Sequence, residues 1–449
     1  MAEKEETGEL KKTLTTPYLI FLAVGSIFGA GLYSMSATMI GLVGDAVWIP
    51  MVILFLFSLF DSFVYTEFAL IYPKMAQVFS YIKEGFGGKL GETLAWINTI
   101  ASIFVGMIIT TMIATSAGAY AVSAIKIFTG ITVDLTIIVA VLILIAFALN
   151  YIGVAEAIGA GDIMTGMELS MVIILIIIGF AFPTRTPDYF APFSIGNLAL
   201  ALALAKSAYS GYATPTNYIE EAKDPIRTIP RSVIGSVIVT LFGYVLAVIA
   251  MIKMCPPSVL AFTPNPFVVA TTPVLGGLAT LYFAIFGTFA AYNGVIFGMG
   301  ARARLLTGMS NEGFLPKIVG RISKRGVPDV SLALFTAILL VGTFFGGYLG
   351  FVWLVKASAV VGMFNMLFVP AALIVHHLRK ETKDMERPWK CPLTIGNVPL
   401  HAVIVLAFGI FVLAYVNPAD LIPTALCYGL AVLLYIVWLI RGKTASKKG

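Results

Sequence analysis

The stretch GSIFGAG, residues 25–31, lies in the middle of an apolar run that extends from about residue 17 to about residue 42. It places three glycines in seven residues, and glycine weakens a helix. Backbone amides in hydrocarbon must be paired, so irregular backbone is tolerated there only where it lines a cavity. GSIFGAG therefore predicts either an interrupted membrane helix or a point of close helix packing through small residues.

The composition around this stretch places the chain in a membrane. Hydrophobic residues make up 59% of the 449 residues and charged residues only 12%, whereas soluble chains carry about 25% charged residues. This excludes a soluble enzyme, a disordered chain and a nucleic-acid-binding protein. Runs long enough to cross about 30 Å of hydrocarbon occur twelve times. They lie near 17–42, 46–72, 92–125, 132–152, 160–182, 196–219, 231–254, 276–304, 329–348, 350–377, 398–416 and 421–441.

The basic residues predict how these spans are oriented. With both termini inside, 24 of the 29 Lys and Arg residues lie in inner segments and three lie in outer loops. This asymmetry follows the positive-inside rule, so the net charge of +6 reports topology and predicts no nucleic-acid partner. The third and eighth runs exceed a perpendicular span, which predicts tilt or extension past the bilayer.

A second glycine-rich segment, SAYSGYATP at residues 207–215, lies in the sixth run. Paired interruptions in spans 1 and 6 are typical of a five-plus-five inverted repeat and point to a transport site. Second half-helices that begin near Gly31 and Ala213 would each offer a positive N-terminus, beside the negative C-terminus of the preceding half. A small zwitterion matches both charges.

This pattern divides the chain into segments. We expect a cytoplasmic tail at 1–16 with no cleavable signal peptide and a first repeat at 17–195. We expect a second repeat at 196–378, a cytoplasmic loop at 379–397, two further spans at 398–441 and a tail at 442–449.

Several motifs in order resemble the amino acid–polyamine–organocation superfamily. They are GSIFGAGLY at 25–33, YTE and YP at 65–73, YSGY at 209–212, EEAKDP and IPR at 220–231, and the segments at 302–316 and 326–328. The resemblance implies an all-α protein of twelve transmembrane helices with helices 1 and 6 broken, in the inverted-repeat fold of sodium-coupled leucine transporters. It implies a secondary amino-acid transporter of the plasma membrane that works by alternating access.

The resemblance also implies a substrate site between spans 1 and 6. The substrate carboxylate is expected on backbone amides and the amino group on backbone carbonyls, with an aromatic ring beside the sixth-span glycine. The amides are those of Gly29, Ala30 and Gly31, and the carbonyls are those near Ile27, Tyr209 and Ser210. The ring is that of Tyr212, next to Gly211. Two positions depart from the family pattern, since Ala213 replaces a usual Glu and KMAQV at 74–78 replaces a Gly-Gly pair.

Ionisable side chains deep in a membrane are candidates for function. Asp61, Glu168, Lys206 and Lys356 lie in spans, and Glu67 lies near an inner edge. Lys206 and Glu168 have depths that differ by only about 5 Å at 1.5 Å per residue. They could form a buried ion pair without a transport role, or one of them could exchange a proton or hold a substrate group. Where proton-coupled family members can carry a Lys in helix 5, this chain carries Glu168.

The remaining charges have two interpretations each. Lys356 is expected to snorkel outward, and Asp61 is either a pathway residue or a packing residue. Glu67 with Arg231 and the basic 302–325 loop either forms an inner gate or consists of solvated topology charges. The three histidines, His376, His377 and His401, are expected in solvated loops with no metal site. Cys427 is expected in the core or facing lipid.

We therefore predict a proton-linked or exchanging amino-acid permease without a cofactor, whose partners are the amino acid and the lipid bilayer. The coupling ion is H⁺ in this hypothesis, and Na⁺ stays open. Lys206 and Ala213 favour neutral or acidic substrates over the alternative, a polyamine or organic-cation exchanger. An intramembrane enzyme would need a nucleophile with a base or a metal cluster, and the sequence offers no such set.

Overall fold

The computed structural model describes residues 14–73, 77–152, 154–219, 222–311, 315–323 and 325–445, and these residues are mostly helical. The α-helices are α1 Thr16–Val43, α2 Trp48–Ile71, α3 Gln77–Phe86, α4 Gly88–Thr129, α5 Leu135–Ile152, α6 Val154–Ala181, α7 Ile195–Tyr209, α8 Pro225–Met254, α9 Pro257–Leu260, α10 Pro266–Asn311, α11 Asp329–Leu349, α12 Phe351–Met366, α13 Phe368–Leu378, α14 Leu400–Tyr415 and α15 Ile422–Ala445. The described residues also form three 3-10 helices and one antiparallel hairpin. The 3-10 helices are η1 Gly44–Val47, η2 Ser210–Tyr218 and η3 Pro418–Leu421, and the hairpin pairs β1 Thr394–Ile395 with β2 Val398–Pro399.

Nine candidate membrane spans occur in the described part of the chain. They fall within nine of the twelve predicted runs or overlap them. The runs 196–219, 329–348 and 398–416 coincide instead with α7 followed by η2, with α11 and with α14, which are shorter or less apolar over their length. The prediction of a polytopic helical membrane protein is confirmed.

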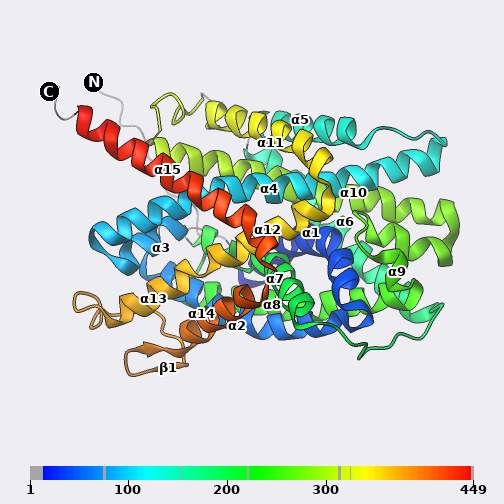
Figure 1. Cartoon of the computed structure of the whole chain (residues 1–449), viewed down its shortest axis with the longest axis horizontal. Coiled ribbons are helices and arrows are strands. Elements are labelled where there is room, and N and C mark those ends of the chain that lie inside the picture. Colours follow the sequence, from blue (N-terminus) through cyan, green and yellow to red (C-terminus); the bar gives the residue numbers. More distant parts are fainter. Residues whose placement is uncertain are drawn as a thin grey trace.

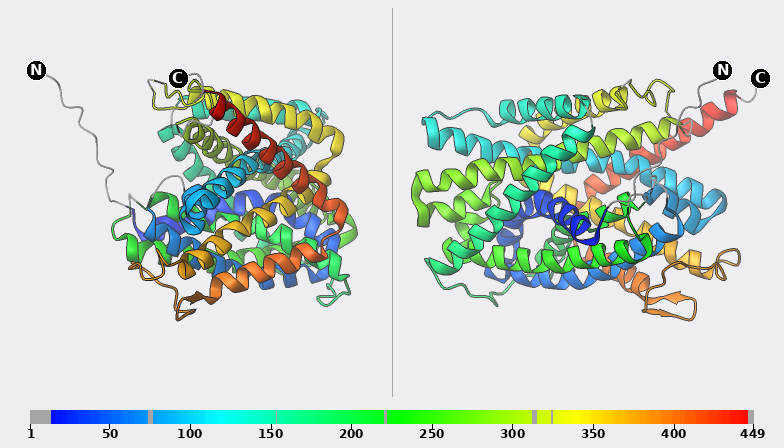
Figure 2. Two further views of the ribbon diagram at one scale, coloured as in Figure 1. Left: turned by 60° about the vertical axis from the view of Figure 1, so that its left-hand side comes forward. Right: turned by 180° about the vertical axis from the view of Figure 1, so that it is seen from behind.

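The helices form one bundle, and most of them run along its long axis (Figure 1). The elements α3, α13 and the β hairpin lie at one end together with the C-terminal part of α15, and α9 lies at the other end, as the reverse view also shows (Figure 2). Helix α3 was not predicted. It is short and buries one face, including Tyr81 and Ile82, in the core.

Helix α1 lies in the interior of the bundle. Its side chains from Leu19 to Val43 are mostly buried, and a helix that is apolar on all sides is expected to be covered on all sides. Helices α5 and α15, by contrast, expose large apolar side chains such as Ile137 and Leu426. In a membrane protein these surfaces face lipid.

The predicted break in the first span is wrong, because α1 is one continuous helix from Thr16 to Val43. Its glycines allow neighbouring helices to approach instead. A Cβ added at Gly25 would overlap the Thr165 side chain, and one at Gly31 would lie 2.5 Å from the Ala208 Cα atom. Glycine is compatible with a helix when packing compensates its cost of about 1 kcal/mol, so the interpretation as close packing holds for these two positions.

Two helices are much longer than a perpendicular span, as the third and eighth runs predicted. Helix α4 has 42 residues and α10 has 46, which corresponds to more than about 60 Å at 1.5 Å per residue. Helix α10 is kinked at Gly276, whose φ of 71° is in the region that favours glycine. The predicted eighth run begins at this kink.

Candidate functional site

The sixth span changes its helix type at the predicted position. Helix α7 ends at Tyr209, and the chain continues as the 3-10 helix η2 from Ser210 to Tyr218 with Pro215 inside it. Proline lacks an N–H donor and clashes with the preceding turn of an α-helix, which explains why α7 does not continue. The second half is not α-helical, so the expected α-helical N-terminus near Ala213 is wrong.

Gly211 brings η2 against the backbone of α1. A Cβ at this position would lie 2.7 Å from the Ile27 nitrogen and 2.7 Å from the Ser26 carbonyl carbon. Any other residue would therefore push η2 away from α1. The predicted neighbourhood of Ile27 and Gly211 is thus present, although its cause is close packing rather than two broken helices. Gly29 and Ala30 lie outside the residues whose side chains the structure describes.

Two backbone carbonyls from α1 and α7 converge on one hydroxyl group. The Tyr244 oxygen, from α8, lies 2.7 Å from the Ile27 carbonyl oxygen and 2.9 Å from the Ala208 carbonyl oxygen. The Tyr244 side chain is fully buried, and its ring packs edge-on against Phe28 and Tyr209. No local pattern in the sequence singles out Tyr244. Ser210, expected among the site carbonyls, is exposed, and its hydroxyl donates to the Ser207 carbonyl.

Lys206, Asp61 and Tyr212 form a buried charged cluster beside the junction of α7 and η2. The Lys206 Nζ atom lies 3.0 Å from Asp61 Oδ2 and donates to the Tyr212 hydroxyl at 2.9 Å. The Tyr212 hydroxyl in turn donates to Asp61 Oδ2. All three side chains are buried. Asp61 from α2 thus joins two residues that stand on either side of the change in helix type.

This cluster replaces the expected meeting of Lys206 with Glu168. Asp61 Oδ2 already receives both donors, and Lys206 forms no hydrogen bond or ion pair with Glu168 among the described residues. The two carboxyl oxygens of Glu168 are buried and have no hydrogen-bond partner among the described residues. Tyr33 of α1 donates to the Glu168 backbone carbonyl at 3.2 Å, which holds α6 against α1.

Comparison with known proteins assigns the chain to a family. Residues 14–439 match the amino acid permease family. The chain belongs to this family. The permease is 26% identical over 414 residues to the human cystine/glutamate transporter, covering 87% of this chain and 78% of the relative. It is 27% identical over 450 residues to the rabbit (Oryctolagus cuniculus) large neutral amino acids transporter small subunit 2, covering 95% and 79%. It is also 22% identical over 457 residues to a branched-chain amino acid permease of Bacillus subtilis, covering 96% and 92%.

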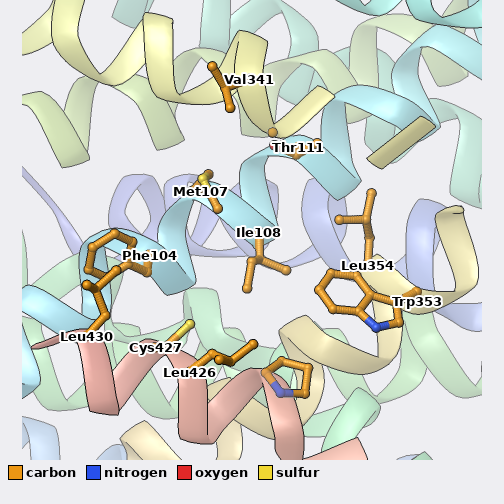
Figure 3. A pocket seen from close by; sticks show the side chains of 12 residues that line it. Phe104, Met107, Ile108, Thr111, Val341, Trp353, Leu354, Leu426, Cys427 and Leu430 are labelled. Atoms are coloured by element: carbon orange, nitrogen blue, oxygen red, sulfur yellow. The ribbon is translucent and has the colours of Figure 1, made fainter. Parts of the chain in front are cut away.

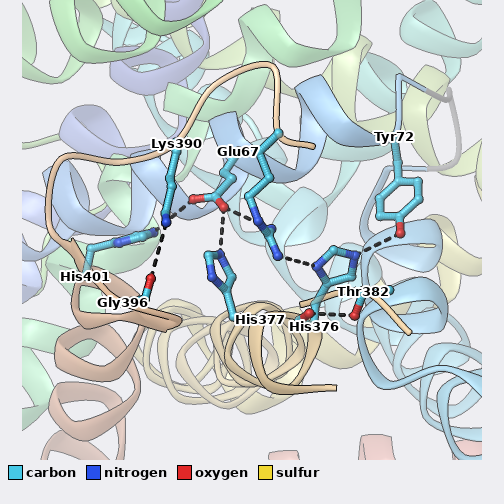
Figure 4. A network of polar contacts seen from close by, with 9 residues as sticks. Glu67, Tyr72, His376, His377, Thr382, Lys390, Gly396 and His401 are labelled. Atoms are coloured by element: carbon cyan, nitrogen blue, oxygen red, sulfur yellow. Dashed lines mark hydrogen bonds and ion pairs between the residues drawn. The ribbon is translucent and has the colours of Figure 1, made fainter. Parts of the chain in front are cut away.

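At the end of the bundle that holds α3 and α13, the permease buries a second polar cluster around Glu67 (Figure 4). Glu67 Oε1 lies 2.7 Å from His377 Nε2 and 3.1 Å from Arg387 Nη1, and Glu67 Oε2 lies 3.8 Å from His401 Nε2. The expected partner Arg231 is exposed and has no part in this cluster. Glu67 therefore joins α2 to α13, to the following loop and to α14.

The cluster continues through His376. Its Nδ1 atom lies 3.2 Å from Arg387 Nη2 and its Nε2 atom 2.9 Å from the Tyr72 hydroxyl. The Thr382 hydroxyl donates to the His376 carbonyl. The expectation of solvated histidines is wrong, because α13 extends through residue 378 and α14 begins at 400. All three histidines are buried, with exposures of 2% or less.

At the opposite end of the bundle, Arg185 holds the loop between α6 and α7 against η1 and α8. It makes a bidentate pair with Asp45 of η1, with N–O distances of 2.7 and 2.6 Å, and donates to the Ile252 carbonyl. The bond to Asp45 raises the pKa of the Arg185 guanidinium above its usual value. The bidentate geometry favours a specific pairing. No local pattern predicts this contact, because its partners are 140 residues apart.

Proposed function

We propose that this permease is a secondary transporter that carries amino acids across the cell membrane by alternating access. In this proposal twelve spans form two inverted five-helix repeats followed by two further helices, and both termini are cytoplasmic. Support comes from the family match, from helices at all twelve predicted runs and from the asymmetry of basic residues.

The observation that carries the proposed site is the convergence of the Ile27 and Ala208 carbonyls on the Tyr244 hydroxyl. Two carbonyl oxygens from different helices lie around one point, so a group with several N–H donors can bind to both of them at once. A substrate ammonium group offers three donors, whereas one hydroxyl offers one. We infer that the ammonium group replaces the Tyr244 hydroxyl when α1 and η2 separate.

The remaining site residues complete this hypothesis. The substrate carboxylate would bind backbone amides near Gly29, Ala30 and Gly31 once the first helix opens locally. Tyr209 would line the space with its ring, since its buried hydroxyl has no hydrogen-bond partner among the described residues.

For the coupling ion we propose a proton that binds the carboxyl group of Glu168. An unpaired carboxylate is costly in a dry interior, so burial favours the neutral acid. Access to water in another conformation would reverse this preference and release the proton. A sodium ion at the same carboxylate is the competing proposal.

The substrate class follows from charge. Lys206 is neutralised by Asp61, so it no longer argues against cationic substrates on its own. Ala213 still leaves η2 without the carboxylate that a cationic side chain would need. Neutral or acidic amino acids are therefore the proposed substrates. The three relatives above are named for cystine, glutamate and large neutral and branched-chain amino acids, whereas a plant relative is named a cationic amino acid transporter, so the proposal rests on the charges of this chain.

Uptake by purified protein in liposomes tests this function. Labelled neutral, acidic and cationic amino acids and a polyamine are supplied with and without an inward pH gradient, and exchange is measured with preloaded vesicles. We expect saturable uptake or exchange of a neutral or acidic amino acid, stimulated by the gradient. Transport of the polyamine alone would favour an organic-cation exchanger, and absence of all amino-acid transport would refute the proposal.

A further inference from the structure

Two features of the bundle lie outside the proposed transport site. One is an apolar groove between α4, α11, α12 and α15, and none of its lining side chains is charged, so its chemistry indicates no particular ligand (Figure 3). The other is the cluster around Glu67, which gathers three buried histidines around one carboxylate (Figure 4). Histidine changes its charge near neutral pH, so the contacts of each histidine decide whether this cluster can bind a proton.

The contacts of His376 hold its ring neutral. Its Nδ1 atom lies 3.2 Å from Arg387 Nη2, and a guanidinium group can only donate, so Nδ1 accepts. The hydrogen of the neutral ring is then on Nε2 and is donated to the Tyr72 hydroxyl at 2.9 Å. A second proton, on Nδ1, would face an arginine N–H. His376 therefore has no acceptor for an added proton.

His377 already makes the contact that a charged ring would make. Its Nε2 atom lies 2.7 Å from Glu67 Oε1, so this nitrogen carries a hydrogen whether the ring is neutral or protonated. An added proton would go to Nδ1 and would bring no new bond to Glu67. The contact of His377 with Glu67 is thus the same in both charge states.

His401 is the histidine with a free position that faces the carboxylate. Its side chain is fully buried, and neither of its ring nitrogens has a hydrogen-bond partner among the described residues. Glu67 Oε2 is also buried without such a partner, and it lies 3.8 Å from His401 Nε2. This distance is too long for a hydrogen bond. Protonation of His401 would place an N–H donor and a positive charge against this oxygen.

Glu67 of α2 and His377 of α13 are the titratable groups among the described residues that face His401. Arg387, in the loop before α14, lies 3.1 Å from the other oxygen of Glu67 and compensates its charge. An added proton on His401 therefore gives the cluster a net positive charge. Glu67 favours this charge, whereas Arg387 and the dry surroundings oppose it. Proton binding at His401 thus depends on Glu67.

The charged groups on the other neighbours of α14 are engaged or remote. Lys206 of α7 is paired with Asp61 of α2. Lys356 of α12 lies ten residues before the end of that helix, on the side away from α13. Lys390, in the loop before α14, is exposed and donates to the Gly396 carbonyl at 3.2 Å. The hairpin residues of β1 and β2 carry no charge.

We propose that His401 is a proton-binding site and that its protonation locks α14 to α2 through Glu67. The charged Nε2–H donates to Glu67 Oε2, and the gap of 3.8 Å closes to the length of a charge-assisted hydrogen bond. The proton comes from water through the loop at residues 379–399, most of which is exposed, and it returns there on release.

The lock reaches the junction of α7 and η2 through α2. Asp61 of α2 holds Lys206 at the end of α7 and Tyr212 in η2, so a restraint on α2 also restrains this junction. This step rests on the proposed function, in which the junction moves during transport and this end of the bundle faces the cytoplasm. Acidification of the cytoplasmic side should then slow transport.

Histidine NMR of the purified full-length permease tests proton binding directly. The chain has three histidines, so isotope-labelled histidine gives three sets of ring signals, which single His→Gln variants assign. We expect the His401 ring to become protonated between about pH 8 and pH 5, while the His376 ring stays neutral. Glu67→Gln should move the His401 transition to lower pH by at least about one unit, because it removes the carboxylate. Lys390→Gln is the matched control and should leave the transition unchanged.

Counterflow of a labelled amino acid tests the lock. The vesicles have the same pH on both sides, so no proton gradient drives the exchange. We expect acidification to slow the wild type about tenfold more than His401→Gln, the effect of one charge-assisted hydrogen bond in the locked state. Thermal unfolding measured in parallel verifies that the variant folds.

A His401 ring that stays neutral down to about pH 5 would overturn the proton site, and so would an unchanged transition in Glu67→Gln. Equal acid sensitivity of exchange in the wild type and in His401→Gln would overturn the lock. The NMR measurement needs no transport, so a failure of the proposed function can be told apart from a failure of this proposal.

Discussion

Lys206 of α7 and Asp61 of α2 form a buried ion pair with an Nζ–Oδ2 distance of 3.0 Å, and the Tyr212 hydroxyl of η2 contacts both. The pair fixes the end of α7 to α2, while Tyr212 ties the first turn of η2 to the same point. Separation of α7 from α2 would leave two charges unpaired in an apolar interior, and separation of η2 would remove the Tyr212 hydroxyl from both. The proposed transport cycle requires the junction of α7 and η2 to move, and the cluster opposes this movement.

Removal of one charge from this pair should be more harmful than removal of both. Asp61→Asn leaves the Lys206 ammonium buried without a counter-ion, and breaking such a pair costs about 3–5 kcal/mol. Replacement of the pair by Asp61→Leu with Lys206→Met should cost less, because no charge stays buried. Thermal unfolding of both variants in detergent measures the difference. Equal loss of stability in the single and double variants would mean that the pair is not dry in solution.

Gly211→Ala should abolish most transport, whereas Gly166→Ala should leave it unchanged. The new Cβ at 211 would meet the Ile27 nitrogen at 2.7 Å, and the one at 166 would have no neighbour within 4 Å among the described atoms. The variant at 211 must move η2 away from α1, which disturbs the proposed site. Uptake rates normalised to reconstituted protein test this comparison. Similar rates in the two variants would exclude the contact of α1 and η2 as the transport site.

Tyr244→Phe should increase the stabilisation that a substrate provides. Without the hydroxyl, the buried Ile27 and Ala208 carbonyls lose this additional hydrogen-bond partner, at a cost of about 0.5–1.5 kcal/mol, because the Ile27 carbonyl keeps its bond within the continuous helix α1. A bound ammonium group should restore this partner. The melting temperature is measured with and without saturating substrate, and its rise should be larger in the variant than in the wild type. An unchanged rise would place the ammonium group elsewhere.

Glu168→Gln should remove stimulation by a pH gradient but keep exchange of amino acids. The amide resembles the neutral acid in shape and cannot bind or release a proton. Uptake with and without the gradient, together with counterflow, separates these two activities. Full gradient-driven uptake in the variant would remove Glu168 from coupling. The test does not depend on Lys206, because the carboxyl oxygens of Glu168 have no hydrogen-bond partner among the described residues.

Arg387→Gln should loosen the end of the bundle around Glu67. The Arg387 side chain is nearly buried and joins Glu67 to His376, with N–O and N–N distances of 3.1 and 3.2 Å. Loss of a buried pair partner is strongly destabilising. Arg231→Gln is the control, because an exposed arginine usually contributes less than about 0.5 kcal/mol. Hydrogen exchange of the 379–399 segment should accelerate only in the Arg387 variant, and equal exchange in both would contradict the role of this cluster.

The sequence by itself determined the membrane class, the positions of the helical runs, the family and an interruption of the sixth α-helix within residues 207–215. These features depend on composition, on run length and on the backbone chemistry of Ser210, Gly211 and Pro215, all of which are local. The segment GSIFGAG was ambiguous for the same reason, since glycine permits both a break and a close contact. Only the packing of α1 against Thr165 and Ala208 decided between these alternatives.

Tertiary structure alone decided which charges meet. Depth along a helix can be counted from the sequence, but its rotation and its neighbours cannot, so Lys206 paired with Asp61 and Glu168 stayed without a partner. The same holds for the three histidines, which are buried because α13 and α14 converge on Glu67. A buried charge or hydroxyl takes the partner that the helix packing brings within about 3 Å, and that distance is a property of the assembled bundle.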